Sequence, residues 1–204
     1  EKKNKDILEQ AYNICPDVGV IAEMLVKKGL KGLEKMEVHV GRPIKMMLCQ
    51  RVEILEDVPE KIKGAFTAEA KYDGERIQAH KNSKGKITLF SRRLENITEQ
   101  FPDVVGYLEK YVSAKEYVLE GEAIAMDEKG KPLPFQTLMQ RRRKYDVAEF
   151  AKKIPVQLKA FDLLYCNGKS FLQEKYRVRQ AQLRELITKN EHIHLSERIT
   201  TDDI

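Results

Sequence analysis

Alternation of apolar and polar residues predicts a strand over residues 66–71. Successive side chains of a strand point to opposite faces. One face of this strand therefore carries three polar side chains: Thr67, Glu69 and Lys71. Gly74 then supplies a turn, and a second strand continues through residues 77–79. The polar face of the first strand would extend to Asp73 if the strand runs that far.

Similar patterns predict the rest of the fold. Further strands are expected over residues 86–90, 117–126 and 156–165. Helices are expected over residues 4–14, 17–29, 101–111, 134–153 in two pieces, and 174–188. Turn residues such as Lys84-Gly85 and Asn167-Gly168 close the strands and favour hairpins over a simple parallel sheet. The predicted class is α+β, with antiparallel-rich sheets flanked by helices and preceded by a short all-helical segment.

Composition sets limits on the class of protein. The 204 residues suffice for one good-sized domain with an appendage, and a net charge of +5 with a pI of about 8.9 permits contact with phosphates. The three cysteines are widely spaced and form neither a Cys-x-x-Cys zinc pattern nor a disulfide framework. No long apolar run suggests a membrane span. We therefore expect an intracellular, cytoplasmic protein without a membrane partner.

Lys71 is the main candidate for chemistry, because it lies between the acids Glu69 and Asp73 in a Lys-x-Asp-Gly stretch. Lysine amines are mostly protonated at neutral pH, and burial and nearby cations favour the neutral, nucleophilic form. Arg76 and Arg92 could supply such cations. Attack on phosphorus suits this setting, since guanidinium groups hold phosphate oxygens and carboxylates hold a divalent ion. The alternative is a solvated strand lysine paired with Asp73, because the tetrapeptide alone is not specific.

Two acids and an aromatic residue strengthen the case for a site. Glu120 and Glu122 lie two residues apart inside an apolar strand, and hence on one face. Buried carboxylates are costly unless cations or hydrogen bonds satisfy them, so this pair indicates either a cation site or a structural salt bridge. Phe161 and Asp162 occur in another apolar strand, where Phe161 alone is equally typical of a hydrophobic core.

Four segments occur in a characteristic order: Glu-Ala-Lys-Tyr-Asp-Gly-Glu-Arg at 69–76, Ser-Arg-Arg at 91–93, Glu-Gly-Glu at 120–122 and Phe-Asp at 161–162. In this order and spacing they resemble the ATP-dependent DNA ligases, in particular the archaeal and eukaryotic replicative type. The resemblance spans most of the chain. It implies a nucleotidyltransferase (adenylation) domain and an enzyme that seals nicks in duplex DNA during replication, repair and recombination.

The resemblance also implies roles for individual residues. Lys71 would attack the α-phosphorus of ATP, release pyrophosphate and form a lysyl-AMP phosphoramidate, with Asp73 assisting the lysine or the metal. AMP would then pass to the 5′-phosphate of a nick, and the 3′-hydroxyl would displace it. The other matched residues are expected to bind AMP: Glu69 at the adenine amine, Arg76 and Arg92 at the ribose and the phosphate or nick, Glu122 at the ribose and the metal, and Phe161 on the adenine ring.

Cofactors, partners and domains follow from the same resemblance. ATP is the expected nucleotide, and Mg²⁺ is the expected ion because hard carboxylate and phosphate oxygens suit it. Nicked double-stranded DNA is the expected substrate, and a sliding clamp is a further expected partner through regions outside this chain. Residues 1–40 match the last helices of a helical DNA-binding domain, and residues 41–204 match the adenylation domain. The family's later lysine motifs and OB-fold domain are not found, which predicts an internal fragment that is not competent for sealing alone.

A run of cations, Arg141-Arg142-Arg143, is a candidate contact for the DNA backbone. Phosphate contacts fix register and make affinity depend on salt without reading sequence, as a nick-sealing enzyme requires. The alternative is a solvated helix end.

Two other functions are consistent with the sequence. An RNA ligase or an mRNA-capping guanylyltransferase also uses a Lys-x-Asp-Gly nucleophile, although the helices before residue 41 and the Ser-Arg-Arg-Leu-Glu stretch favour a DNA ligase. A catalytically silent module that binds nucleic acid belongs to a different class. In that module, the replacement of Lys71 would leave function intact.

Overall fold

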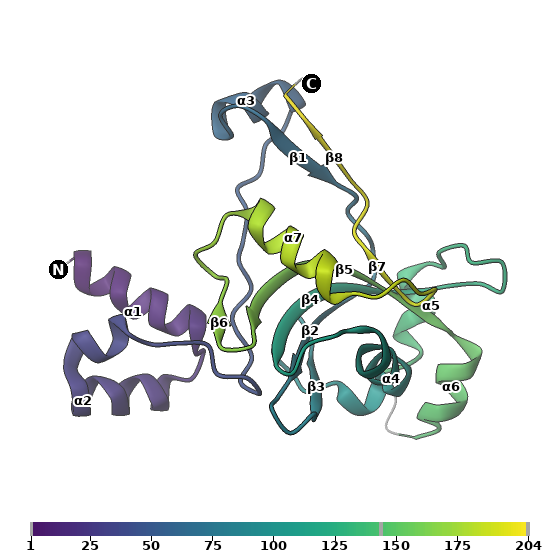
Figure 1. Cartoon of the computed structure of the whole chain (residues 1–204), viewed down its shortest axis with the longest axis horizontal. Coiled ribbons are helices and arrows are strands. Elements are labelled where there is room, and N and C mark those ends of the chain that lie inside the picture. Colours follow the sequence, from purple (N-terminus) through teal and green to yellow (C-terminus); the bar gives the residue numbers. More distant parts are fainter. Residues whose placement is uncertain (1, 143–144, 203–204) are drawn as a thin grey trace.

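A twisted antiparallel sheet organises the computed structural model, which describes residues 2–142 and 145–202 (Figure 1). Within these residues the sheet has six strands, in the order β3-β2-β4-β5-β6 with β7 parallel to β5. The strands are β2 (Glu75–Lys81), β3 (Ile87–Phe90), β4 (Tyr117–Ala125), β5 (Val156–Cys166), β6 (Lys169–Ser170) and β7 (Ile193–Leu195). The predicted α+β class and the four longer strands are confirmed, whereas β6 and β7 were not predicted.

The two faces of the sheet differ in polarity. One face is apolar and carries Ile77, Leu119 and Leu158 in the main hydrophobic core. Helices α4 (Pro102–Tyr111) and α7 (Tyr176–Leu186) add buried residues to that core and lie in front of the sheet in Figure 1. The opposite face of β2 and β4 is polar, because Arg76 pairs with Glu122 and Gln78 with Glu120 in the strand register. The polar face therefore holds the acids that the sequence singles out.

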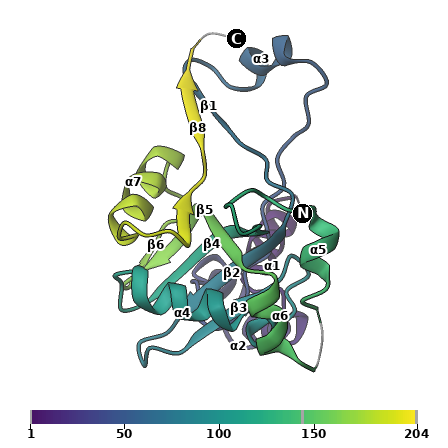
Figure 2. The same ribbon diagram turned by 90° about the vertical axis from the view of Figure 1, so that its right-hand side faces the viewer.

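Short helices connect the strands at the edge of the sheet. They are η2 (Thr98–Gln100), α5 (Phe135–Met139) and α6 (Val147–Lys153). Figure 2 shows α6 next to α4, with α5 above α6 on the right. The two-piece helix predicted over 134–153 is confirmed, but residues 140–142, at its centre, lie outside both helices.

A helical pair, α1 (Lys2–Ile14) and α2 (Val18–Glu34), projects from one side of the sheet. Asp17 caps α2 by accepting a hydrogen bond from the Val20 N–H at 3.1 Å, as expected for an N-cap residue. Gly29 interrupts this helix with a φ of 63°, and the chain then resumes helical conformation to Glu34. The first helix therefore ends at Gly29, as the sequence predicted, and a second helical stretch follows, whose Leu33 packs with Ile7 and Ile21.

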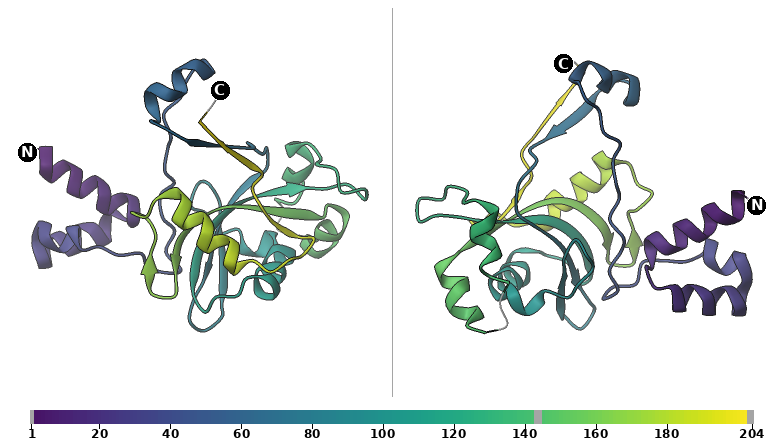
Figure 3. Two further views of the ribbon diagram at one scale, coloured as in Figure 1. Left: turned by 45° about the horizontal axis from the view of Figure 1, so that its top comes forward. Right: turned by 180° about the vertical axis from the view of Figure 1, so that it is seen from behind.

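A two-stranded ribbon, β1 (Phe66–Glu69) with β8 (Arg198–Thr201), stands apart from the main sheet (Figure 3). It follows η1 (Leu55–Asp57) and α3 (Val58–Lys61). Strand β1 ends at Glu69, so the predicted strand through residue 71 is too long. Ala70 still donates its N–H to the Glu197 carbonyl, but the chain then leaves the ladder. No helix among the described residues is both long and apolar enough to cross a membrane.

Candidate active site

The segment between β1 and β2 presents Lys71 beside the polar face of the sheet. Gly74 fixes this segment against β4, since a Cβ atom there would lie 2.2 Å from the Ala123 carbonyl oxygen. The Gly74 N–H donates to Oε1 of Glu122 at 3.2 Å. Only glycine fits such a close approach without moving the backbone. The Lys-x-Asp-Gly turn is therefore held directly against the strand that carries Glu122.

Five of the residues predicted for catalysis or nucleotide binding line one cavity of about 620 Å³: Lys71, Asp73, Arg76, Arg92 and Glu122. They come from the 71–74 turn, from β2, from the turn after β3 and from β4. Lys71 is exposed at the rim of this cavity. The sequence-based expectation that burial desolvates its amine is therefore wrong. The cavity combines one amine with guanidinium and carboxylate groups, which is a set of groups suited to phosphate and a divalent ion.

Glu122 has the most perturbed ionisation of these residues. Burial raises the pKa of its carboxyl group to about 7, against the opposing effects of the Gly74 N–H, Arg76 and Lys71. A carboxyl group that titrates near neutral pH is typical of a site that exchanges protons or cations. Arg76 and Lys71 offset only part of the effect of burial on the pKa of Glu122. A further cation beside Glu122 would therefore favour its ionised carboxylate.

The pKa of Glu122 predicts a pH dependence of stability in the absence of nucleotide and metal. The folded state holds the proton more tightly than the unfolded state, since the pKa is raised from 4.5 to about 7. This stabilisation is complete below about pH 4.5 and is lost as the pH rises through 7. Thermal unfolding between pH 4 and 8 should therefore depend less on pH in Glu122→Gln than in the unmodified protein. Parallel pH profiles of the melting temperature in the two proteins would contradict this expectation.

Arg76 connects the cavity to the polar face of the sheet. Its Nη2 donates to Oε2 of Glu120 at 2.6 Å, and its guanidinium lies over the Phe161 ring, 5.0 Å from the centroid. Arg76 Nε is buried and has no hydrogen-bond partner among the described residues. Glu120 is thus in a structural ion pair, as one of the two sequence hypotheses stated, while Arg76 retains donor capacity for an acceptor.

A tight turn after β3 presents Arg92. The Ser91 Oγ accepts hydrogen bonds from the N–H groups of Arg93 and Glu95 at 3.2 and 3.3 Å, and Leu94 has a φ of 65°. This arrangement leaves both arginines exposed beside the cavity, which they line. Within the described part of the chain, Arg92 thus has no buried ion pair to break before it binds an anion.

Two predicted nucleotide contacts do not line this cavity. Glu69 lies on a neighbouring cavity of about 940 Å³, with its carboxylate beside Tyr176. Burial and this carboxylate raise the pKa of Tyr176 to about 12. Phe161 does not line the first cavity, but its ring contacts the guanidinium of Arg76, which does. Glu69 and Lys71 do not share one strand face, because β1 ends before Lys71.

The predicted DNA contact at Arg141 is wrong. Arg141 is 1% exposed and donates to both carboxylate oxygens of Asp103, at 2.5 and 2.8 Å. Arg142 forms an ion pair with Glu75 at the edge of the first cavity. Arg143 lies outside the described residues. A run of like charges does not show which side chain turns inward, and here the first one is buried.

Three polar residues on β2 were missed by sequence reasoning. Glu75, Gln78 and His80 are buried. Gln78 and His80 alternate with the buried apolar residues Ile77 and Ala79, so they share a face with Arg76. Polar residues at every second position of an apolar strand were a signal that could have revealed them.

The donor set fits a nucleotide and a divalent ion. Arg76 and Arg92 would hold phosphate or sugar oxygens, and Glu122 with Asp73 would hold the metal. No group of three or more His, Cys, Asp or Glu side chains among residues 2–142 and 145–202 could hold a metal alone.

Comparison with known proteins gives a consistent result. The family model described as "ATP dependent DNA ligase domain" matches residues 46–204. DNA ligase 1 of Methanosarcina barkeri is 44% identical over the whole chain, which covers 38% of that protein. DNA ligase 2 of Korarchaeum cryptofilum is 46% identical over 94% of the chain, which covers 32% of that protein. The chain thus spans about a third of the length of these curated relatives.

A solved structure named Pmar-Lig_Pre has the same fold. It is 18% identical with a TM-score of 0.53, and the match covers 90% of this chain and 40% of the other. The segment that matches the family model contains Lys71, Arg76, Arg92 and Glu122, which line one cavity. The chain therefore belongs to the ATP-dependent DNA ligase domain family.

Proposed function

We propose that the full-length protein is a DNA ligase that seals nicks in duplex DNA, with ATP as adenylate donor and Lys71 as nucleophile. The observation that carries this proposal is the meeting of Lys71, Arg76 and Glu122 at a single cavity. The family match favours DNA ligation over the RNA ligase, capping and binding-module alternatives, because the relatives are named DNA ligases.

The first step of the proposed reaction is the attack of the neutral Lys71 amine on the α-phosphorus of ATP. A nitrogen–phosphorus bond forms, the bond to the pyrophosphate oxygen breaks, and the amine proton passes to solvent or to Asp73. Water can reach the amine because Lys71 is exposed. In the later steps AMP passes to the 5′-phosphate, and the 3′-hydroxyl displaces it to join the strand.

The residues around Lys71 have distinct proposed roles. Arg76 and Arg92 bind the ribose and phosphate oxygens, and Phe161 stacks on the adenine. Glu122 and Asp73 hold Mg²⁺, which neutralises phosphate charge when it is bound. Glu69 stays a prediction as an adenine contact, since it lines the neighbouring cavity beside Tyr176.

The domain assignment is also part of this proposal. Residues 1–40 would end a helical DNA-binding domain, and residues 41–204 would form most of the adenylation domain. The separate small core of α1 and α2 supports this division. Nothing in the described residues bears on the sliding clamp, which stays a prediction.

The proposal is tested by nick sealing. The full-length protein should join a nicked duplex in the presence of ATP and Mg²⁺, and should transfer labelled AMP but not GMP to itself. Covalent labelling from GTP alone would favour a capping guanylyltransferase. Joining of nicked RNA but not DNA would favour an RNA ligase. Absence of any covalent nucleotide would favour a binding module.

A further inference from the structure

A buried chain of hydrogen bonds joins the backbone of residues 41–44 to Arg76. It passes through three side chains of the polar sheet face: His80, Gln78 and Glu120, which are 1%, 0% and 2% exposed. We call these three side chains the Gln78 network. Buried polar groups are normally retained only when hydrogen bonds satisfy them. None of these three side chains lines the cavity that holds Lys71.

The direction of each hydrogen bond can be assigned. The Gly41 N–H donates to Nδ1 of His80 at 3.0 Å, so Nδ1 carries no proton. His80 is therefore neutral with its proton on Nε2, which donates to Oε1 of Gln78 at 2.9 Å. Burial lowers the pKa of His80 to about 3, in agreement with a neutral ring.

Gln78 uses both ends of its amide. Its Oε1 accepts from the Ile44 N–H at 2.7 Å, and its Nε2 donates to the Ile44 carbonyl at 3.0 Å. The same Nε2 donates to Oε1 of Glu120 at 3.0 Å. A carboxylate only accepts, so the opposite orientation of the amide would place oxygen against oxygen. Gln78 thus holds the junction backbone and Glu120 at the same time.

Glu120 connects Gln78 to Arg76, so the orientation of Glu120 affects the orientation of Arg76. Its second oxygen accepts the 2.6 Å hydrogen bond from Arg76, whose other contact is the Phe161 ring. Without Gln78, one oxygen of a buried carboxylate would lose its donor, and Glu120 would be free to turn. The guanidinium of Arg76 would then lose the contact that sets its direction.

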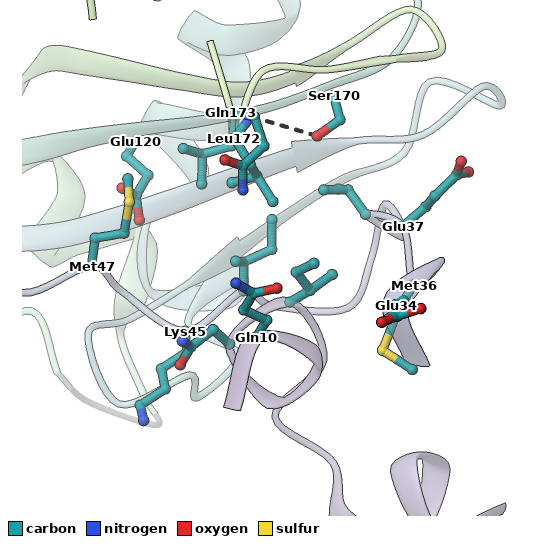
Figure 4. Close-up of a pocket in the computed structure, with 15 residues that line it drawn as sticks. Gln10, Glu34, Met36, Glu37, Lys45, Met47, Glu120, Ser170, Leu172 and Gln173 are labelled. Atoms are coloured by element: carbon teal, nitrogen blue, oxygen red, sulfur yellow. Dashed lines mark hydrogen bonds between the residues drawn. The ribbon is translucent and has the colours of Figure 1, made fainter. Parts of the chain in front are cut away.

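Packing around the junction leaves room for such movement. Ile44 packs on Val118 and Leu164, but it also borders a cavity of about 350 Å³ that Glu120 lines. Figure 4 shows Glu120 and Met47 on the left of this cavity, with Gln10 of α1 below them. Because an open space adjoins the junction, dense packing alone does not fix it, and the paired hydrogen bonds of Gln78 supply the missing restraint.

We propose that Gln78 is a positioning residue, which orients Arg76 for the nucleotide through Glu120. The orientation of Arg76 then depends on the position of the backbone of residues 41–44. This inference rests on the proposed function. It adds a route by which the segment between the helical pair and the sheet affects nucleotide binding.

A double-mutant cycle in the full-length protein tests the proposal. Gln78→Met keeps the size of the side chain and removes its hydrogen bonds. We expect it to raise the KM for ATP in self-adenylation about tenfold, with a much smaller change in kcat. In the Arg76→Ala background the same substitution should change the KM less than about twofold, because residues that act through one another are not additive.

Controls separate positioning from loss of stability. Leu89→Val weakens the apolar core beneath the same sheet without touching the Gln78 network, and should leave the KM unchanged. Gln78→Asn retains an amide that is too short to bridge Ile44 and Glu120, and replaces Gln78→Met if that variant does not fold. Additive effects of the Gln78 and Arg76 substitutions, or an unchanged KM, would overturn the inference. Absence of self-adenylation in the unmodified protein would instead overturn the proposed function.

Discussion

Replacement of Lys71 by alanine is expected to reduce covalent labelling of the full-length protein by α-labelled ATP more than about a thousandfold. Lys71 is the only lysine among the described residues that line the cavity. The arginines beside it cannot take its place, because a guanidinium group stays protonated in proteins. Nick joining should be lost to the same degree, since the later steps consume the lysyl adenylate.

The measurement is gel detection of the labelled protein, followed by mapping of the modified peptide. Lys71→Arg should be equally inactive, although it keeps the positive charge. Lys84→Ala removes an exposed lysine from the β2–β3 hairpin and should label normally. Labelling of Lys71→Ala at the normal level would show that another residue is the nucleophile.

Replacement of Arg141 by alanine is expected to destabilise the protein by about 3–5 kcal/mol. Besides Asp103, Arg141 donates to the carbonyl groups of Ile154 and Gln100 at 3.2 Å and lies over the Phe101 ring. Its removal leaves a largely buried carboxylate without its cation and takes one donor from each of two carbonyl groups. Breaking a buried pair by removing one partner costs more than the pair itself contributes.

Urea unfolding measured by circular dichroism would give this free energy. Lys153→Ala is the matched control, because its ion pair with Glu149 is exposed and should contribute no resolvable stability. The affinity of folded Arg141→Ala for nicked DNA should show the same salt dependence as that of the unmodified protein. A flatter salt dependence with unchanged stability would restore Arg141 as a DNA contact.

Local patterns predicted most of the main sheet. The alternation and turn residues around β2 to β5 locate these strands within a few residues. The order of short motifs groups Lys71, Arg76 and Glu122 into one predicted site, and these residues line one cavity. Such features are encoded within a few residues of sequence. Long-range pairing is not, and β8 was missed because its partner β1 lies more than a hundred residues away.

The errors have the same physical origin. Strand β1 ends at Glu69 because its partner strand ends there, which no local alternation indicates. The burial of Arg141 depends on Asp103 and Ile154, which are distant in sequence. Gln78 likewise acquires its role only when residues 41–44 pass beside β2. In each case a tertiary neighbour decides what the local pattern leaves open.

The open position of Lys71 would have a consequence for the proposed transfer of AMP to DNA. A duplex is too bulky to enter a narrow tunnel, and a nick lies on its outer surface. A nucleophile at the mouth of its cavity can present the activated nucleotide outward, so the broken strand needs only to lie across the rim. The cost of this openness is access by water, and any surface that covers the rim during transfer would also protect the phosphoramidate from hydrolysis.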